Sequence, residues 1–426
     1  MRVLMISANT EQVNMPVLPI GMARVAAAVE AAGHDIRVVN LMRPEHVIRE
    51  LPGTISGFAP EVIGISVRNI DNQDRQDPKF LLPPVKAVIE ECRRLSAAPV
   101  VLGGPGYSIF PRAVLAYLSA DYGIQGEGEK DFPELLDRIA AKASVEDIPG
   151  LVMPGEGMRR PPHRIRQLDD YPLPRPGLHL VVPEDVDTEQ LWVPFQTRRG
   201  CPMNCSYCST PAIEGSVMRH QSLKASVKNL ETYVAAGYKR FFFVDNLFNV
   251  PSGYAESLCD ALITADADIA WQAIIYPERL DNQLVGKMAR AGCTGVALGF
   301  ESGSKQILSA LNKKFGPIDI RNVSELFRRS GISRRGFLLL GGPGETRDTV
   351  EESLAFAEYL DLESVKLTAG IRIYPHTLLA GQAIEKGLVE AGDDLLYPKF
   401  YMEPGLEDWL PEKVMQLAEQ RPDWYI

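Results

Sequence analysis

Short apolar segments alternate with amphipathic helical segments through most of this chain, and the alternation limits the folds open to it. In residues 1–145 the apolar segments have the length and composition of strands. They are Arg2–Ala8, Asp35–Asn40, Val62–Val67, Pro99–Leu102 and Tyr122–Gln125. The predicted helices are Ile20–Ala32, Val85–Leu95, Ala113–Leu118 and Phe132–Ala140. Such alternation forms a parallel sheet covered on both faces. We therefore expect an α/β, five-stranded, doubly wound Rossmann-like domain, with ligands beyond the carboxyl ends of its strands.

A second alternation of strand and helix repeats six times between residues 191 and 375. The predicted strands are Val193–Thr197, Arg240–Val244, Ala270–Ile275, Gly295–Phe300, Gly336–Leu340 and Lys366–Ile373. Six parallel strands are too few to close an eight-stranded barrel. We expect a partial (β/α)6 barrel, open on one side for substrate, with active residues at the carboxyl ends of its strands.

The remaining segments are predicted to connect and cover these two domains. Frequent prolines in residues 146–190 exclude long helices and central strands, so we expect an extended linker with a small hairpin at Gly150–Met158. Residues 376–426 are expected to cap the open side of the barrel. Their predicted elements are the helices Ala380–Gly387 and Pro411–Glu419, followed by the aromatic residues Trp424 and Tyr425.

Composition excludes several classes of partner. The 426 residues carry a formal net charge of −10, whereas binding to a nucleic-acid backbone needs a basic face. Charged residues interrupt every apolar run before it reaches the length of a membrane span. With only 6 cysteines and an N-terminus that reads as a strand instead of a signal peptide, we expect a cytoplasmic protein without a disulfide framework.

Three of the 6 cysteines fall within eight residues, at Cys201, Cys205 and Cys208. Thiolates are soft ligands suited to zinc or iron–sulfur clusters. A closed structural zinc site takes four ligands, and no fourth Cys or His lies nearby at finger-like spacing. Three thiolates on a four-iron cube would leave one iron open for chemistry. A zinc knuckle or chance clustering remains the alternative.

The spacing C-x3-C-x-aromatic-C, with Tyr207 as the aromatic, resembles the motif of the radical S-adenosylmethionine (SAM) enzymes. In that family the cysteines bind a [4Fe-4S] cluster whose open iron is chelated by SAM. The N-terminal domain resembles the cobalamin-binding domain of B12-dependent radical SAM proteins. The residues that carry this resemblance are Leu18–Ala23 as the opening helix, with Gly103, Gly104, Pro105 and the turn Gly126, Glu127, Gly128, Glu129 as nucleotide-tail loops.

The expected cobalamin site lacks one common feature of B12 proteins. No histidine follows an aspartate by two residues, so the Asp-x-His-x-x-Gly motif that supplies a cobalt ligand is absent. We expect the loop Arg68–Asn72, including Arg68 and Asn69, to lie against the corrin instead; for Arg68 the alternative is a surface ion pair. The glycine loops match neither a dinucleotide fingerprint nor a P-loop, which disfavours NAD and ATP, although Gly-Gly-Pro-Gly can also be an ordinary tight turn.

Four places in the predicted barrel are candidates for SAM contacts. Asp245 and Asn246 follow the second strand, where Asp245 is expected either to accept from the SAM amino group or to cap a helix. The resemblance implies ribose and carboxylate contacts for Glu301 and Ser302, and an adenine contact for Gly341 and Gly342. Arg372 is expected to pair with a carboxylate of SAM or substrate, or else with Glu301 or Asp245.

The resemblance implies that reductive cleavage of SAM gives a 5′-deoxyadenosyl radical, and that methylcobalamin delivers a methyl group from SAM to an unactivated carbon of a small-molecule substrate. It also implies an external electron donor such as flavodoxin or ferredoxin. A cyclisation, rearrangement or epimerisation without methyl transfer is the alternative, and a non-catalytic cobalamin or redox sensor is the second. Methylthiotransferases are excluded on ligand count, because their N-terminal domain needs three cysteines and this one has only Cys92.

Overall fold

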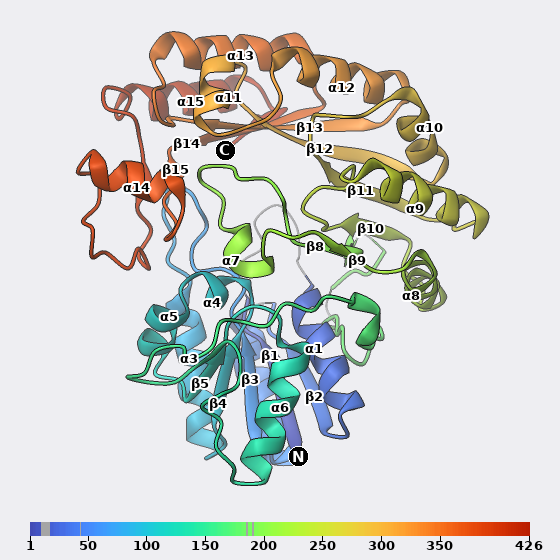
Figure 1. Ribbon diagram of the computed structural model, residues 1–426, viewed down its shortest axis with the longest axis vertical. Coiled ribbons are helices and arrows are strands. Elements are labelled where there is room, and N and C mark those ends of the chain that lie inside the picture. Colours follow the sequence, from blue (N-terminus) through green and yellow to red (C-terminus); the bar gives the residue numbers. More distant parts are fainter. Residues whose placement is uncertain (10–17, 43, 185, 190) are drawn as a thin grey trace.

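The computed structural model describes residues 1–9, 18–42, 44–184, 186–189 and 191–426. It contains two large sheets, one in each half of the chain, and Figure 1 shows them stacked along the long axis with α7 (Thr210–Glu214), β8 (Arg198–Arg199) and β9 (Arg219–His220) between them. Among the described residues, none of the helices has the length and hydrophobicity that a membrane span requires.

The first sheet has the strand order β2-β1-β3-β4-β5-β6. Its strands are β1 (Arg2–Ser7), β2 (Asp35–Asn40), β3 (Val62–Ser66), β4 (Val100–Gly103), β5 (Tyr122–Ile124) and β6 (Leu151–Val152). The first five are parallel, as the alternation predicted, and their carboxyl ends point toward the second sheet. The hairpin expected at Gly150–Met158 does not form among these residues, because β6 instead pairs antiparallel with the edge strand β5.

Helices cover both faces of this sheet. They are α1 (Ile20–Ala31), α2 (Pro44–Phe58), α3 (Leu82–Leu95), α4 (Pro105–Ile109), α5 (Pro111–Leu118) and α6 (Gly128–Ala140). Helix α1 packs beside α6, and α2 beside α3. The alanines of α1, which include the fully buried Ala23 and Ala26, allow that helix to lie close to the sheet. Helix α2 was not predicted, because Pro52 and Gly53 interrupt its helical pattern.

The second sheet has the order β17-β14-β13-β12-β11-β10-β7, and all of its pairs are parallel. Its strands are β7 (Val193–Phe195), β10 (Arg240–Phe243), β11 (Ala270–Ile275), β12 (Cys293–Glu301), β13 (Ser333–Leu340), β14 (Ser364–Ala369) and β17 (Trp424–Tyr425). The six predicted strands are present, but the sixth, predicted as Lys366–Ile373, ends earlier than expected. Strand β14 stops at Ala369, Gly370 has a φ of +88°, and Ile371 and Arg372 pair antiparallel with Tyr401 and Phe400 outside this sheet. The seventh, β17, is a correction: the aromatic residues at the chain end extend the sheet beside β14.

The helices of this half lie along one side of its sheet (Figure 1). They are α8 (Leu223–Ala235), α9 (Ser252–Thr264), α10 (Asn282–Arg290), α11 (Lys305–Ala310), α12 (Pro317–Arg329), α13 (Arg347–Leu360) and α15 (Trp409–Gln420). The remaining elements are the 3-10 turn at Leu168–Asp170, α14 (Leu378–Glu385) and the antiparallel pair β15 (Ile371–Arg372) and β16 (Phe400–Tyr401).

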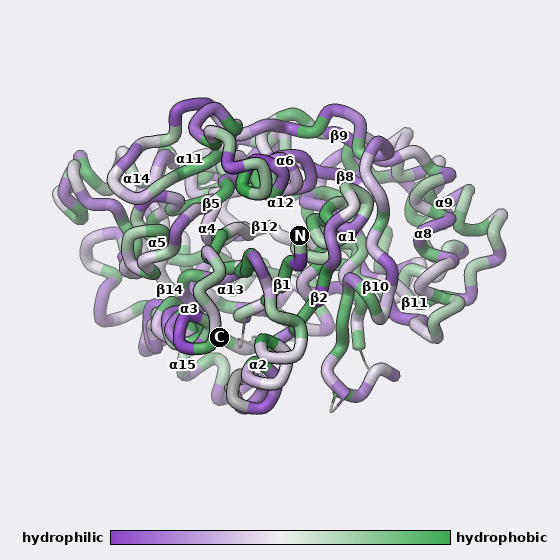
Figure 2. The backbone as a smooth tube through the Cα atoms, turned by 90° about the horizontal axis from the view of Figure 1, so that it is seen from below, coloured by the Kyte–Doolittle hydropathy of each residue, from purple (hydrophilic) through white to green (hydrophobic). Residues whose placement is uncertain are grey.

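Among the described residues, apolar side chains form three buried clusters, and two of them contain residues from both halves of the chain. One joins Leu18, Ala23 and Met42 to the core of the second sheet. The other combines Ile6 of β1 and Val67, which follows β3, with residues of the C-terminal segment, among them Ile371, Leu379 and Tyr401. Figure 2 shows hydrophobic stretches running through the interior, with hydrophilic stretches mostly on the outer loops and helix faces. The two halves are therefore joined by a common core.

Candidate cofactor and active site

The three clustered cysteines lie in an irregular loop that directly follows β8. Gly200 opens the loop with a φ of +86°, and a Cβ at this position would lie 2.2 Å from the carbonyl oxygen of Val217. Only glycine fits there without strain. The N–H of Cys201 donates to Gly215 O at 3.1 Å, which draws the two ends of the loop together.

The donor set fits a cluster bound through three protein ligands. All three cysteines are free thiols; Cys201 is buried, while Cys205 and Cys208 are half-buried. Burial is the main cause that raises the pKa of the Cys201 thiol to about 11, and the neighbouring Cys208 and Cys205 contribute to this rise. Among the residues that the structure describes, no three His, Cys, Asp or Glu side chains already surround a common metal position. The loop therefore offers three neighbouring thiols, and none of them is consumed in a disulfide.

Tyr207 and Glu301 meet beside this loop, together with a lysine that sequence reasoning missed. The Tyr207 hydroxyl donates to Glu301 Oε1 at 3.0 Å. Lys313 Nζ lies 2.9 Å from the Tyr207 hydroxyl and 3.1 Å from Glu301 Oε1, and its side chain is 5 % exposed. In the sequence Lys313 stands beside Lys314 in a polar stretch, which looks like ordinary surface charge.

Asp245 does not stand free to accept from the SAM amino group. It is completely buried, and its oxygens accept from Thr197 N at 2.7 Å, Thr197 Oγ1 at 2.6 Å and Arg198 N at 2.8 Å. It also forms an ion pair with Arg198 at 2.9 Å. Nor is it a helix cap, since α9 begins at Ser252. Asp245 thus fixes Thr197 and Arg198, the residues that lead from β7 into β8 and the cysteine loop.

Ser302 and Asn246 also have partners within the chain. Ser302 is buried, with its Oγ 2.8 Å from Ser353 Oγ and accepting from Ser304 N at 3.0 Å. Asn246 Nδ2 donates to Glu214 Oε2 at 2.6 Å. A SAM contact at either residue would have to replace these bonds.

The glycine loop after β13 is closed by its own glutamate. The N–H groups of Gly341 and Gly342 both donate to Glu345 Oε2. Burial raises the pKa of Glu345 to about 7, although these two hydrogen bonds oppose the shift. A Cβ on Gly341 would lie 2.5 Å from Met402 Sδ, so the C-terminal segment covers this loop. The N–H groups of Gly341 and Gly342 are therefore not free to donate to an adenine ring.

Arg372 was predicted to pair with a ligand carboxylate, or else with Glu301 or Asp245; the structure gives it a different partner. Its Nε donates to Asp71 Oδ2 at 2.8 Å. Its other nitrogens donate to the carbonyl oxygens of Ile373, Leu395 and Leu396. Both side chains are almost fully buried, at 3 % for Arg372 and 1 % for Asp71. Arg372 therefore joins the two halves of the chain and presents no free edge to a ligand.

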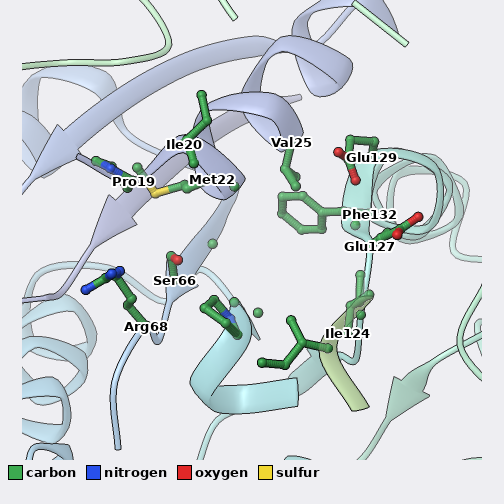
Figure 3. Close-up of a pocket in the computed structure, with 18 of the residues that line it drawn as sticks. Pro19, Ile20, Met22, Val25, Ser66, Arg68, Ile124, Glu127, Glu129 and Phe132 are labelled. Carbon is green, nitrogen blue, oxygen red and sulfur yellow. The ribbon is translucent and has the colours of Figure 1, made fainter. Parts of the chain in front are cut away.

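A cavity of about 300 Å³ lies at the carboxyl ends of the first sheet and brings together most of the residues predicted to contact cobalamin (Figure 3). Those residues are Arg68, Gly103, Gly104, Pro105, Gly126 and Glu127. The start of α1, Leu18–Met22, lines it as well, whereas Asn69 does not. Residues of the second half complete the wall: Pro194, Gln196, Arg199, Ile213, Glu214 and Val244. The cavity thus lies between the first sheet and the segments that flank the cysteine loop.

The cavity wall is largely apolar, and the described residues leave one of its cations, Arg68, without a partner. A Cβ on Gly103 would meet nothing closer than Ile124 O at 3.9 Å, so the backbone there leaves room for a bulky group. Arg68 lines the cavity, and Figure 3 shows it on the opposite side from Phe132. Within the described part of the chain, no hydrogen bond or ion pair engages Arg68, and burial lowers its pKa. The surface ion pair considered for Arg68 is absent there, and its guanidinium is available to a ligand.

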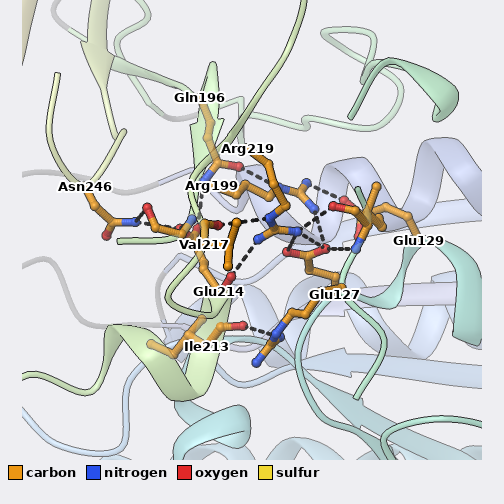
Figure 4. A network of polar contacts seen from close by, with 12 residues as sticks. Glu127, Glu129, Gln196, Arg199, Ile213, Glu214, Val217, Arg219 and Asn246 are labelled. Atoms are coloured by element: carbon orange, nitrogen blue, oxygen red, sulfur yellow. Dashed lines mark hydrogen bonds and ion pairs between the residues drawn. The ribbon is translucent and has the colours of Figure 1, made fainter. Parts of the chain in front are cut away.

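A network of charged side chains joins the polar end of the cavity to the cluster loop (Figure 4). Glu127 pairs with Arg219 at 2.7 Å, and Glu129 pairs with Arg199. Glu214 accepts from Gly200 N at 3.0 Å, directly before Cys201. The carboxylate of Glu127 therefore has two roles: it lines the cavity, and it takes part in the ion-pair network beside the cysteine loop. Sequence reasoning missed Arg219, whose partner Glu127 lies 92 residues away, and Glu214, which follows the cysteine motif without being part of it.

Comparison with known proteins agrees with this geometry. A model of the B12 binding domain matches residues 6–136, and a model of the radical SAM superfamily matches residues 195–357. An uncharacterised methyltransferase of Pyrococcus horikoshii is 27 % identical over 91 % of this chain and 84 % of its own length. Tryptophan 2-C-methyltransferase of Streptomyces laurentii is 25 % identical over 89 % of this chain and 74 % of its own length.

Solved structures show the same fold. The methyltransferase TsrM of Kitasatospora setae, with cobalamin and a [4Fe-4S] cluster bound, superposes with a TM-score of 0.84 at 22 % identity, covering 100 % of this chain and 90 % of TsrM. The cobalamin-dependent radical enzyme OxsB superposes with a TM-score of 0.79 at 15 % identity, covering 98 % of this chain and 66 % of OxsB. The order of a B12-binding fold followed by a radical SAM fold is therefore established for this chain.

Proposed function

Because this chain belongs to the radical SAM enzymes that carry a B12-binding domain, we propose that it is a methyltransferase that moves a methyl group from SAM, with cobalamin as carrier, to a carbon atom of a small-molecule substrate. Residues 1–145 are assigned to cobalamin, 191–375 to the cluster and SAM, and 376–426 to the cap. Two relatives are named as methyltransferases, and one of them as a tryptophan C-methyltransferase, which supports this reaction class.

The observation that carries the proposal is the cavity shared by the two halves of the chain. One wall of the cavity is the glycine-rich edge of the first sheet, and the other wall includes Ile213 and Glu214 of α7. That helix begins two residues after Cys208. A group carried in the cavity therefore lies next to the loop that would hold the cluster, as transfer between the two cofactors requires.

Each group of residues has a separate task in the proposed site. Cys201, Cys205 and Cys208 would hold the cluster, and Glu301, fixed through Oε1, would present Oε2 to the hydroxyl groups of SAM. Gly103 and Gly104 would admit the nucleotide tail of cobalamin, and Arg68 would face the corrin in place of a histidine ligand. When bound, the cluster and SAM supply the electron and the methyl group, and cobalamin carries the methyl group. A flavodoxin or ferredoxin would supply the electron.

The test is anaerobic reconstitution with iron, sulfide and cobalamin, followed by incubation with SAM that carries a deuterated methyl group. L-Tryptophan is the first substrate probe, within a panel of small aromatic compounds. We expect the label in extracted cobalamin and in product. The Cys208→Ala variant should lose both signals, and the matched Cys259→Ala variant, which alters a buried thiol in α9, should keep them.

Other outcomes separate the alternatives. A product that forms without label would contradict methyl transfer and indicate a rearrangement or cyclisation. A fully loaded protein that consumes no SAM and leaves no label on cobalamin would contradict catalysis and favour a sensor.

A further inference from the structure

A buried cation lies beside the cysteine loop, and the functions assigned so far do not use it. Lys313 follows α11, and its side chain is 5 % exposed. Its ammonium is 2.9 Å from the Tyr207 hydroxyl and 3.1 Å from Glu301 Oε1. It also lies 5.3 Å from the centre of the Tyr207 ring and 5.8 Å from that of Phe315. Removing such a group from water is costly unless its charge is compensated.

The position of Lys313 links the cysteine loop to the second half of the site. Tyr207 stands between Cys205 and Cys208, whereas Glu301 ends β12, and Lys313 touches both. Glu301 itself has a φ of +63°, a conformation that a glutamate seldom adopts without support from its neighbours. Lys313 and Tyr207 supply that support by binding the same carboxylate oxygen.

Lys313 lies next to the cysteine ligands. Its ammonium contacts the hydroxyl of Tyr207, the residue directly before Cys208. The carboxylate that compensates its charge, Glu301, is also largely buried, with a side chain 14 % exposed. In a region that holds so little water, a charge acts on its neighbours more strongly than it would in solvent, and replacing the lysine would leave the Glu301 carboxylate beside the loop without its cation.

We propose that Lys313 is a positioning residue that ties the cysteine loop to Glu301 and makes the cluster held by Cys201, Cys205 and Cys208 easier to reduce. The inference rests on the proposed function only for the presence of the cluster. In the step concerned, one electron passes from an external low-potential electron donor to the cluster, whose charge becomes more negative by one. A buried cation beside the loop that carries the ligands stabilises the product of that step more than the starting state.

The experiment is a redox titration of the reconstituted cluster, followed by electron paramagnetic resonance without SAM, cobalamin or substrate. Lys313→Met removes the charge, and Lys313→Arg keeps it. The matched control is Lys314→Met, since Lys314 is an exposed neighbour whose Nζ bonds to Asn312 Oδ1 at 2.7 Å. Iron and sulfide are counted in every variant. Equilibrium binding of SAM is measured as a second readout, because Glu301 loses one of its two partners in Lys313→Met and keeps only Tyr207.

For Lys313→Met we expect the ratio of reduced to oxidised cluster at a fixed potential to fall about tenfold, equivalent to about 59 mV for one electron. SAM affinity should fall with it. Lys313→Arg and Lys314→Met should stay within twofold of the unmodified protein in both readouts.

Three results would overturn the inference. One is a potential for Lys313→Met equal to that of Lys314→Met, and another is an equal shift in Lys313→Met and Lys313→Arg, which would exclude charge as the cause. The third is loss of iron from both Lys313 variants, which would make the residue structural. An unmodified chain that binds no iron would instead refute the proposed function itself.

Discussion

The substitution Asp71→Asn tests whether Arg372 joins the two halves of the chain. It removes the negative partner and leaves the Arg372 guanidinium buried, with only carbonyl oxygens around it. Leaving one charge of a buried pair uncompensated costs about 3 to 5 kcal/mol. The double variant Asp71→Asn with Arg372→Met removes both charges, so its loss should be smaller than the sum of the single losses by about 1 to 3 kcal/mol.

The assay is denaturant unfolding of the four proteins of this double-mutant cycle. The structure offers a matched control in Arg334, which is also 3 % exposed and also donates to carbonyl oxygens, but whose partner Glu363 is 48 % exposed. Glu363→Gln should cost about 1 kcal/mol or less, because water can replace an exposed partner.

Cobalamin binding provides a second readout for the same substitution. Asp71 lies three residues after Arg68 on the loop that borders the cavity, so Asp71→Asn should also weaken binding of cobalamin. A coupling energy near zero, or a loss no larger than that of Glu363→Gln, would refute the reasoning.

Three further predictions follow from single positions. Burial raises the pKa of Asp131 from 3.8 to about 7, so between these pH values the folded protein keeps a proton that the unfolded chain releases. The free energy of unfolding should therefore fall as the pH rises from about 4 to 7. The Asp131→Asn variant should not show this fall, and denaturant unfolding at pH 8 should find it about 2 to 4 kcal/mol more stable than the unmodified protein. Gly200→Ala places a Cβ against Val217 O and should cost most of the bound iron, measured against Gly253→Ala, where the Cβ meets open space. Arg68→Leu should raise the cobalamin dissociation constant about tenfold, or about 1.4 kcal/mol, while the iron content stays unchanged; an unchanged constant, or an absorption spectrum typical of imidazole-ligated cobalt, would contradict the role given to Arg68.

The strands and the cavity were predictable because local sequence determines them. Buried parallel strands such as Val62–Ser66 and Ala270–Ile275 are short apolar runs between helices, and their carboxyl ends must meet at one edge. This is why Arg68, Gly103 and Gly126, which are far apart in the sequence, were expected around one cavity and do line it. The two-residue strand β17 carries too little pattern to be recognised.

Side-chain partners were much less predictable, because the sequence does not show which distant residues meet. Arg372 was expected to pair with a carboxylate of SAM or substrate, or else with Glu301 or Asp245, yet its partner Asp71 is 301 residues away. Asp245 was correctly placed at the end of a strand, but its bonds to Thr197 and Arg198 depend on the neighbouring strand β7. Lys313 looked like a surface lysine, and only the fold brings Tyr207 and Glu301 to it.

The core shared between residues near the two ends of the chain has a consequence for biosynthesis. Ile6 and Val67 leave the ribosome early, whereas Ile371 and Tyr401, which pack in the same cluster, are translated near the end. During synthesis, part of the apolar surface of the N-terminal half therefore stays exposed to solvent until the C-terminal segment has been translated. Expression of residues 1–145 alone should yield a species prone to aggregation, and co-expression of the remaining chain should rescue its solubility.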